Sequence, residues 1–236
     1  MAIKPKNHLL ASLSATEWSR SRKHFEPFDL VRGNVLVEAG ERFSHLYFPE
    51  DGIVSMVATF ETGAMAETAT IGPEGVVSVR AVLGGKNALN RKIVQVSGAS
   101  YRIEMRAIER LQREIPAFRV ELLAYAQVFL SQAMQLVACN GVHSLEERCA
   151  RWLLMYHDRS ERDRFPLTQE FWAEMLGVSR PAVNRVARAL QDAGLISYGR
   201  GVIEIEDRRG LKKMSCECYE IVRNHFDQLL PGSFKR

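Results

Sequence analysis

The sequence predicts an α+β protein with an N-terminal β-barrel or jelly roll, a long central dimerisation helix and a C-terminal winged helix-turn-helix. Three observations support this prediction. Short runs of β-branched and aromatic residues alternate with turn signals in the first half of the chain. A stripe of apolar residues at helical spacing follows them. The last third combines a helix cap, a glycine turn and a basic helix face in the order of a helix-turn-helix.

The first half of the chain contains short candidate strands at regular spacing. Turn signals such as Glu50-Asp51-Gly52 separate them. Short, evenly spaced strands are typical of a barrel or a jelly roll, so we expect one such domain over residues 1–115. The expected strands are residues 35–37, 46–48, 53–57, 66–70, 93–96 and 101–103.

A long apolar helix is expected from residue 118 to 137, after a shorter helix that Pro116 ends. Apolar residues recur along it at helical spacing, and few charges follow Glu121. This surface must be buried against the β-domain, against a second copy of the chain, or against both. We predict a dimer through this helix; burial within its own domain alone is the alternative. The expected dimer contacts are Leu123, Ala126, Leu130, Met134 and Val137.

A hinge is expected where the long helix ends. Residues 139–142, Cys-Asn-Gly-Val, break the helical pattern, and Ser144 with Glu147 forms a capping box that opens the next helix. We therefore assign residues 116–143 to the dimerisation helix and its hinge. Residues 144–236 form the last domain, which includes a C-terminal amphipathic helix.

The segment from residue 167 to 192 has the pattern of two helices joined by a tight turn. Thr168 is the expected N-cap of the first helix, and Gly177 can adopt the positive φ that the turn needs. Ser179 is the next N-cap, and Pro181 fits only in the first turn of a helix. The second helix therefore begins near Arg180. Its inward face is Ala182, Val183, Val186, Ala187 and Leu190.

A short β-hairpin is expected after Gly194. The residues there alternate with period two on both sides of Gly199-Arg200-Gly201, so Arg200 lies at the tip. This hairpin is the wing of a winged helix; a loose surface loop is the alternative.

The outward face of the second helix carries side chains suited to DNA. Arg and Asn can form bidentate hydrogen bonds with guanine and adenine in the major groove. We expect Arg180, Asn184 and Arg185 to contact bases. The alternative is a helical hairpin with a solvated basic face. The expected phosphate contacts are Thr168, Gln169, Ser179, Arg188 and Arg200.

Charge is distributed unevenly along the chain. The net charge is only +4, but residues 180–213 contain eight basic and four acidic side chains, the local basic footprint of a nucleic-acid contact. We find no apolar run of membrane-spanning length and no signal-peptide core, and therefore expect a cytoplasmic protein without membrane contact.

The motif Gly177-Val178-Ser179-Arg180, followed by Val183, Arg185, Leu190 and Gly194-Leu195-Ile196, resembles the DNA-binding half of the CRP/FNR superfamily of bacterial transcription regulators. The resemblance extends over roughly residues 28 to 210. It implies a winged helix at the C-terminus, a cyclic-nucleotide-binding-like β-barrel at the N-terminus and a long dimerising helix between them.

The chain departs from the cyclic-AMP-binding members of that family in its phosphate cassette. Those members supply a Gly-Glu pair and an Arg followed by Ser or Thr, where this chain has Ser78-Val79 and a loop over residues 84–92 without that Arg pair. Cyclic AMP is therefore not the expected ligand. A pocket for another small anion would contain Ser78, Arg91, Lys92 and Met134; solvated charges at Arg91 and Lys92 are the alternative.

No metal or cofactor is expected. Iron–sulfur members need four thiolates with a cluster near the N-terminus, and the first cysteine here is Cys139. The haem type uses a barrel Cys beside His, and His45 has none. Zinc at Cys216-x-Cys218 lacks nearby partners beyond His225. A redox role for Cys216 and Cys218, one buried and the other partly exposed, stays a hypothesis.

The sequence thus predicts a homodimeric, sequence-specific DNA-binding transcription regulator that binds a palindromic operator and works with RNA polymerase. Two other classes of protein are the alternatives. One is a ligand-binding module whose helix-turn-helix contacts protein. The other is an enzyme, which we do not expect, because the chain has no phosphate-binding loop, metalloprotease His pair or nucleophile elbow.

Overall fold

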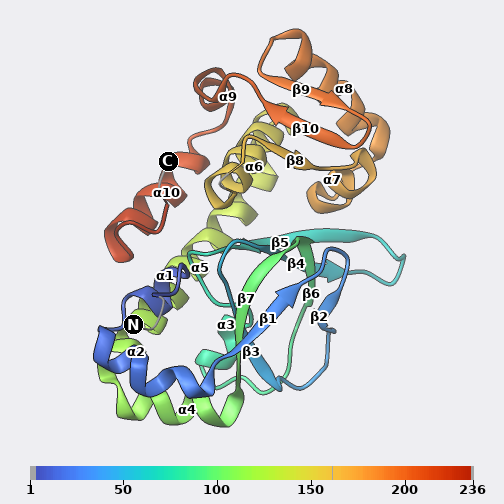
Figure 1. Cartoon of the computed structure of the whole chain (residues 1–236). Helices are drawn as coiled ribbons and strands as arrows, with labels where there is room; N and C mark the ends of the chain where they lie inside the picture. The colour runs from blue at the N-terminus through green and yellow to red at the C-terminus, as the bar shows by residue number, and fades with distance from the viewer. Residues whose placement is uncertain (1–3, 161, 235–236) are drawn as a thin grey trace.

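The computed structural model describes residues 4–160 and 162–234. It has the three parts expected from the sequence: a β-domain, a long helix behind it, and a winged helix-turn-helix above (Figure 1). Short helices α1 (His8–Ala11) and α2 (Ala15–Ser21), with a 3-10 turn Arg22–His24, precede the first strand.

The β-domain consists of two antiparallel sheets. One has the order β1 (Glu26–Leu30), β7 (Gly98–Glu104), β3 (His45–Pro49). The other has the order β2 (Val35–Val37), β6 (Arg91–Val96), β4 (Ile53–Thr59), β5 (Met65–Ile71). Among the described residues no strand pairing joins the two sheets, so the prediction of a closed barrel is wrong. Two separate sheets agree with the other predicted arrangement, the jelly roll. β1 was not expected, because its sequence, Glu-Pro-Phe-Asp-Leu, has no β-branched residue.

Helices connect and cover the sheets. A one-turn helix α3 (Val79–Val82) follows Ser78, which has a left-handed conformation with φ of 72°. Helix α4 (Met105–Glu114) leads into α5 (Pro116–Val142), which is longer than predicted. Residues 139–142, expected to be a hinge, are helical. The chain turns at His143, whose extended backbone has φ of −91° and ψ of 150°.

The last part begins with α6 (Leu145–Arg159), opened by the predicted Ser144–Glu147 capping box. Strand β8 (Arg164–Pro166), α7 (Gln169–Leu176), α8 (Arg180–Asp192), β9 (Ile196–Gly199) and β10 (Val202–Ile205) follow. The expected C-terminal helix is two helices, α9 (Arg208–Met214) and α10 (Cys218–Leu229), with Cys216 at the break. Helix α10 returns to pack along α5 (Figure 1).

The hydropathy of helix α5 is higher than expected from the sequence. It is long and apolar enough to cross a membrane by length and composition, so the expectation that no apolar run approaches that length is wrong. Buried core helices meet the same criterion. The inner face of α5 is packed against α10, α4, α3 and β5, which accounts for part of its apolar surface.

Candidate nucleic-acid interface

The turn between α7 and α8 is held by local interactions that the sequence predicted. The hydroxyl of Thr168 accepts a hydrogen bond from the backbone N–H of Phe171 (3.2 Å), which caps α7. Gly177 ends α7 with φ of 64°, a conformation that costs a residue with a Cβ about 1 kcal/mol or more. Ser179 occupies the N-cap position of α8 but makes no capping hydrogen bond with its side chain. The helix-turn-helix is therefore confirmed.

Helix α8 is divided into a buried and an exposed face. Val183, Val186, Ala187 and Leu190 are buried in the core, together with Trp172 of α7. Arg180, Arg185 and Arg188 are exposed on the opposite face. A helix held by a buried apolar face and presenting guanidinium groups on the other has the form of a major-groove recognition helix.

Asn184 differs from the arginines because another side chain holds it. The amide nitrogen of Gln169 donates to the Oδ1 atom of Asn184 over 3.2 Å, and Asn184 is half-buried. Gln169 was predicted to contact phosphate, and its bond to Asn184 was not expected from the sequence. Because Oδ1 has two lone pairs, Asn184 keeps one acceptor site and both amide protons for a base.

The wing is a regular β-hairpin, so the loose-loop alternative is wrong. Arg200 and Gly201 form its two-residue turn, with φ of 51° and 73°. Positive φ at both positions is typical of the type I′ turn. The Tyr198 hydroxyl donates to the Leu167 carbonyl (3.1 Å), and β8 pairs with β10. These contacts fix the wing beside the start of α7 and leave Arg200 exposed at the tip.

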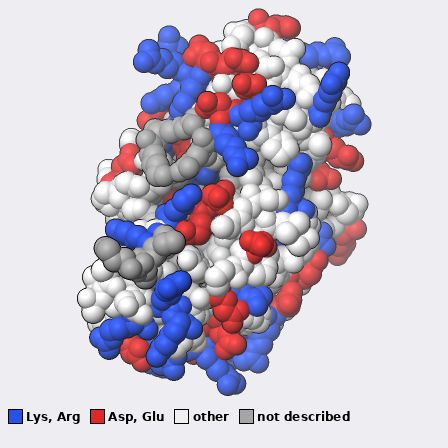
Figure 2. All heavy atoms as spheres, viewed as in Figure 1, with Lys and Arg blue, Asp and Glu red and all other residues white. Residues whose placement is uncertain are grey.

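The basic residues of the last third do not all face one surface. Arg208 lies 2.5 Å from the buried carboxylate of Asp158 and also bonds the Tyr219 hydroxyl, so it is structural. Lys212 pairs with Glu220. Figure 2 shows basic side chains around the upper end of the molecule, interspersed with acidic ones. The count of eight basic residues over positions 180–213 therefore overstates the basic surface. The exposed basic residues on α8 and the wing are Arg180, Arg185, Arg188 and Arg200.

The comparisons with known proteins agree with this geometry. Residues 147–214 match the Crp-like helix-turn-helix domain. The chain is 33% identical over 111 residues to the HTH-type transcriptional regulator Cmr of Mycobacterium tuberculosis; this match covers 47% of the chain and 44% of that relative. The chain therefore aligns with less than half the length of the curated relative.

Solved structures match over nearly the whole fold. FixK2 from Bradyrhizobium japonicum superposes with a TM-score of 0.69 at 17% identity, covering 81% of this chain and 98% of that one. The c-di-GMP-responsive global regulator CLP from Xanthomonas campestris gives 0.68 at 14% identity, covering 82% of this chain and 100% of that one. The chain therefore contains a Crp-like helix-turn-helix domain and has the fold of solved CRP/FNR regulators. Its predicted α+β architecture, apart from barrel closure, is thereby confirmed.

The β-domain has a cavity of about 710 Å³ against α5. Ser78 and Lys92 line it, as predicted. Arg91 does not, because it pairs with Glu38 at the surface (2.9 Å). Met134 does not either; it lies further along α5 and is 66% exposed. The predicted pocket is therefore wrong for Arg91 and Met134.

The polar groups of the cavity are suited to an anion. Burial lowers the pKa of Lys92 to about 8, and the nearby charge of Arg80 acts in the same direction. The Lys92 ammonium donates to the Asn90 carbonyl (2.5 Å), and the buried Ser78 hydroxyl has no hydrogen-bond partner. Arg80 also lines the cavity. It was not predicted as a pocket residue, because helix α3, which carries it, was not expected from the sequence.

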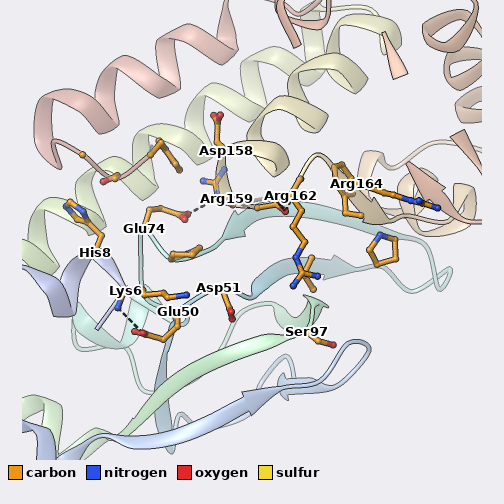
Figure 3. A pocket seen from close by; sticks show the side chains of 18 residues that line it. Lys6, His8, Glu50, Asp51, Glu74, Ser97, Asp158, Arg159, Arg162 and Arg164 are labelled. Atoms are coloured by element: carbon orange, nitrogen blue, oxygen red, sulfur yellow. Dashed lines mark hydrogen bonds and ion pairs between the residues drawn. The ribbon is translucent and has the colours of Figure 1, made fainter. Parts of the chain in front are cut away.

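A second cavity of about 410 Å³ lies between the β-domain, the end of α6 and the C-terminal segment. Figure 3 shows basic and acidic side chains around it, with Arg162 and Arg164 opposite Glu50 and Asp51. At its back, Arg159 bonds Glu74 over 2.8 Å. The mixed charges do not favour one class of ligand, so this cavity supports no ligand assignment.

The outward face of α5 is largely apolar and exposed. Leu123, Leu130, Met134 and Val137 are exposed, but Ala126 is only 7% exposed, because it packs under the β-domain. Ala126 is therefore wrong as a dimer contact. The exposed positions follow a strict 3-4 spacing. They are Val120, Leu123, Gln127, Leu130, Met134, Val137 and Gly141, a set we call the outer stripe.

The cysteines lie differently from what was expected. Cys216 and Cys218 are both buried, 4% and 1% exposed, so the expectation that one is partly exposed is wrong. Cys139 of α5 and His143, which follows the end of that helix, lie beside them, and the four ligand atoms fall within 4.8 Å of one another. The expectation that zinc at Cys216 and Cys218 lacks nearby partners is therefore wrong. Burial and the Cys139 thiol raise the pKa of Cys216 to about 12, which disfavours a reactive thiolate in the metal-free chain.

Proposed function

We propose that this CRP/FNR regulator acts as a homodimer that binds a two-fold symmetric DNA operator, with α8 in the major groove. The observation that carries the proposal is helix α8, whose apolar face is buried and whose free face carries Arg180, Asn184 and Arg185. Thr168, Gln169, Ser179, Arg188 and the wing residue Arg200 surround that face and are proposed to bind or orient toward the phosphates.

The outer stripe supports the dimer. Its 3-4 spacing is the pattern that keeps an apolar seam facing a partner helix along its full length. The stripe spans Val120 to Gly141, which is about 32 Å of helix at 1.5 Å per residue. Two copies paired through it would carry two recognition helices, as an operator with two half-sites requires.

Selection from a random DNA pool with purified, ligand-stripped protein tests this proposal. A two-fold palindrome with half-sites about 10 base pairs apart, or a multiple of that spacing, is expected. An asymmetric single site would contradict the dimeric operator. Failure to bind DNA at low salt would favour a helix-turn-helix used for protein contacts. As such a regulator, the chain is proposed to act in the cytoplasm beside RNA polymerase.

A second proposal concerns the cavity against α5. The unpartnered Ser78 hydroxyl, Arg80 and the buried Lys92 favour a small anionic effector other than cyclic AMP. The cavity also touches Leu123 and Leu130 of the outer stripe, so a ligand there would bias the dimer seam. An effector is supported if the protein enriches a DNA site only after a small-molecule cell extract is added, and if Lys92→Met protein then enriches none. Enrichment by the wild-type protein without extract would contradict an effector that is required for DNA binding.

A further inference from the structure

A cluster of thiols lies at the junction of the central helix and the DNA-binding part. Cys139 lies on the last turn of α5, and His143 directly follows the helix as its C-cap, where its backbone N–H donates to the Cys139 carbonyl over 3.0 Å. Cys216 and Cys218 flank the break between α9 and α10. The three cysteines form a buried cluster separate from the main hydrophobic core.

The geometry points to a zinc site with Cys139, His143, Cys216 and Cys218 as its ligands. The Sγ atoms of Cys139 and Cys216 are 3.5 Å apart, and the Sγ atom of Cys218 lies 3.7 Å from Nδ1 of His143. A tetrahedral ion with Zn–S near 2.3 Å and Zn–N near 2.0 Å has edges of about 3.5–3.8 Å. The widest separation, within 4.8 Å, needs to close by about 1 Å, which side-chain rotation supplies.

Two further side chains hydrogen-bond to the proposed ligands, as the neighbours of metal ligands do in known zinc centres. The carboxylate of Glu217 lies 3.2 Å from Nε2 of His143. A proton on Nε2 leaves the Nδ1 lone pair directed at the thiols, which is the carboxylate–histidine–metal arrangement. The side-chain amide of Gln135 donates to the Cys218 sulfur over 3.0 Å and would stabilise its thiolate.

The chemistry of the donor set selects the class of metal. Three thiolates and one imidazole in a closed, buried site match structural Zn²⁺ and exclude hard oxygen-seeking cations such as Mg²⁺ or Ca²⁺. Binding would convert three thiols to thiolates and release three protons to solvent for each ion. No open coordination position remains, so the role is structural.

The position of the site gives it a consequence for the fold. Residues 139–143 lie where the chain enters the DNA-binding part, and residues 216–218 lie where it leaves. One ion would join both ends at a single point beside His143, where the chain turns from α5 into α6. Zinc binding at this site does not depend on whether the protein binds a palindromic operator.

Metal analysis of the full-length chain, purified anaerobically with a reductant and without an affinity tag that binds metal, tests the inference. We expect about one zinc per chain, and after exchange with Co²⁺ the intense visible bands and near-ultraviolet thiolate charge-transfer band of a tetrahedral site. No bound metal after incubation with Zn²⁺ would overturn the inference. A bound iron–sulfur cluster, or a Cys139–Cys216 disulfide that persists under the reductant, would overturn it too.

Substitutions assign the ligands. Cys216→Ala should lose the zinc and the Co²⁺ charge-transfer band, while Cys149→Ala is the matched control. Cys149 is equally buried but lies in the main core on α6, and its variant should keep one zinc. Equal zinc in both variants would overturn the assignment.

A substitution at the surface tests the same site without the risk of unfolding that a buried cysteine variant carries. The Glu217 side chain is 69% exposed, so Glu217→Gln leaves the four ligands and the core intact. We expect its zinc affinity, measured by competition with a chelating dye, to fall by about 10–100-fold. Glu146→Gln, an exposed change on α6, is the control and should bind zinc as wild type does. An unchanged affinity in Glu217→Gln would contradict the role of His143 as a ligand oriented by Glu217.

Discussion

The guanidinium of Arg159 donates to the carboxylate of Glu74 over 2.8 Å, and each side chain is only 1% exposed. Glu74 follows β5 in the β-domain and Arg159 ends α6, so the pair joins the β-domain to the part that contains the helix-turn-helix. Arg159 also donates to Oε1 of Gln132 on α5 (3.0 Å) and to the Met155 carbonyl (2.8 Å). One buried cation therefore connects all three parts of the chain.

Removing one partner of this pair should destabilise the protein strongly. Arg159→Met leaves the Glu74 carboxylate buried without its counter-charge, and we expect a loss of about 3–5 kcal/mol in the free energy of unfolding. The double variant Arg159→Met/Glu74→Leu should recover much of that loss, because no unpaired charge remains. Urea unfolding of the single and double variants measures both. A double variant less stable than Arg159→Met would contradict this account.

The recognition helix should separate base contacts from phosphate contacts. Arg185→Ala should cost about 1–3 kcal/mol on the selected operator and relax its sequence preference at one position. Arg200→Ala should weaken binding to all sequences and reduce the salt slope by about 1, because the wing tip contacts phosphate. Binding isotherms at several salt concentrations measure the two effects. Arg91→Ala, in the surface pair with Glu38, is the control and should bind as wild type does.

The outer stripe of α5 should determine the oligomeric state. Leu130 is 60% exposed, and Leu130→Arg would place a charge in the centre of the proposed seam. We expect a dimer for wild type and a monomer for this variant by light scattering. Phe60→Arg is the control, since Phe60 is 57% exposed but lies in the β4–β5 turn, and it should stay dimeric. A monomeric wild type at micromolar concentration would rule out the seam.

Lys92 should make stability depend on pH in the alkaline range. Burial lowers its pKa in the folded chain to about 8, from the usual 10.5. Between these values the unfolded chain binds more protons, so stability rises with pH. The cost of burying the charge is therefore full below pH 8 and disappears as pH rises to about 10.5. Lys92→Met removes this term, and we expect it to raise the melting temperature at pH 7 with a smaller gain at pH 10. A gain independent of pH would contradict this origin.

The helix-turn-helix shows how much local sequence can specify. The Thr168 cap, the positive φ of Gly177 and the alternation around Arg200 each act within a few residues. The helix pair and the wing therefore followed from the sequence directly. The end of α5 was less predictable, because residues 139–142 carry a break signal that tertiary contacts with α10 override.

The sequence by itself determined the fold class, the Crp-like helix-turn-helix and the exposed face of α8, because helical and strand periodicity and caps are short-range properties. The tertiary structure alone decided which distant residues meet. It brought Cys139 to Cys216, paired Glu74 with Arg159, buried Ala126 and withdrew Arg91 from the cavity to Glu38. These contacts join residues that are tens of positions apart, and their formation depends on the path of the whole chain, which no local pattern encodes.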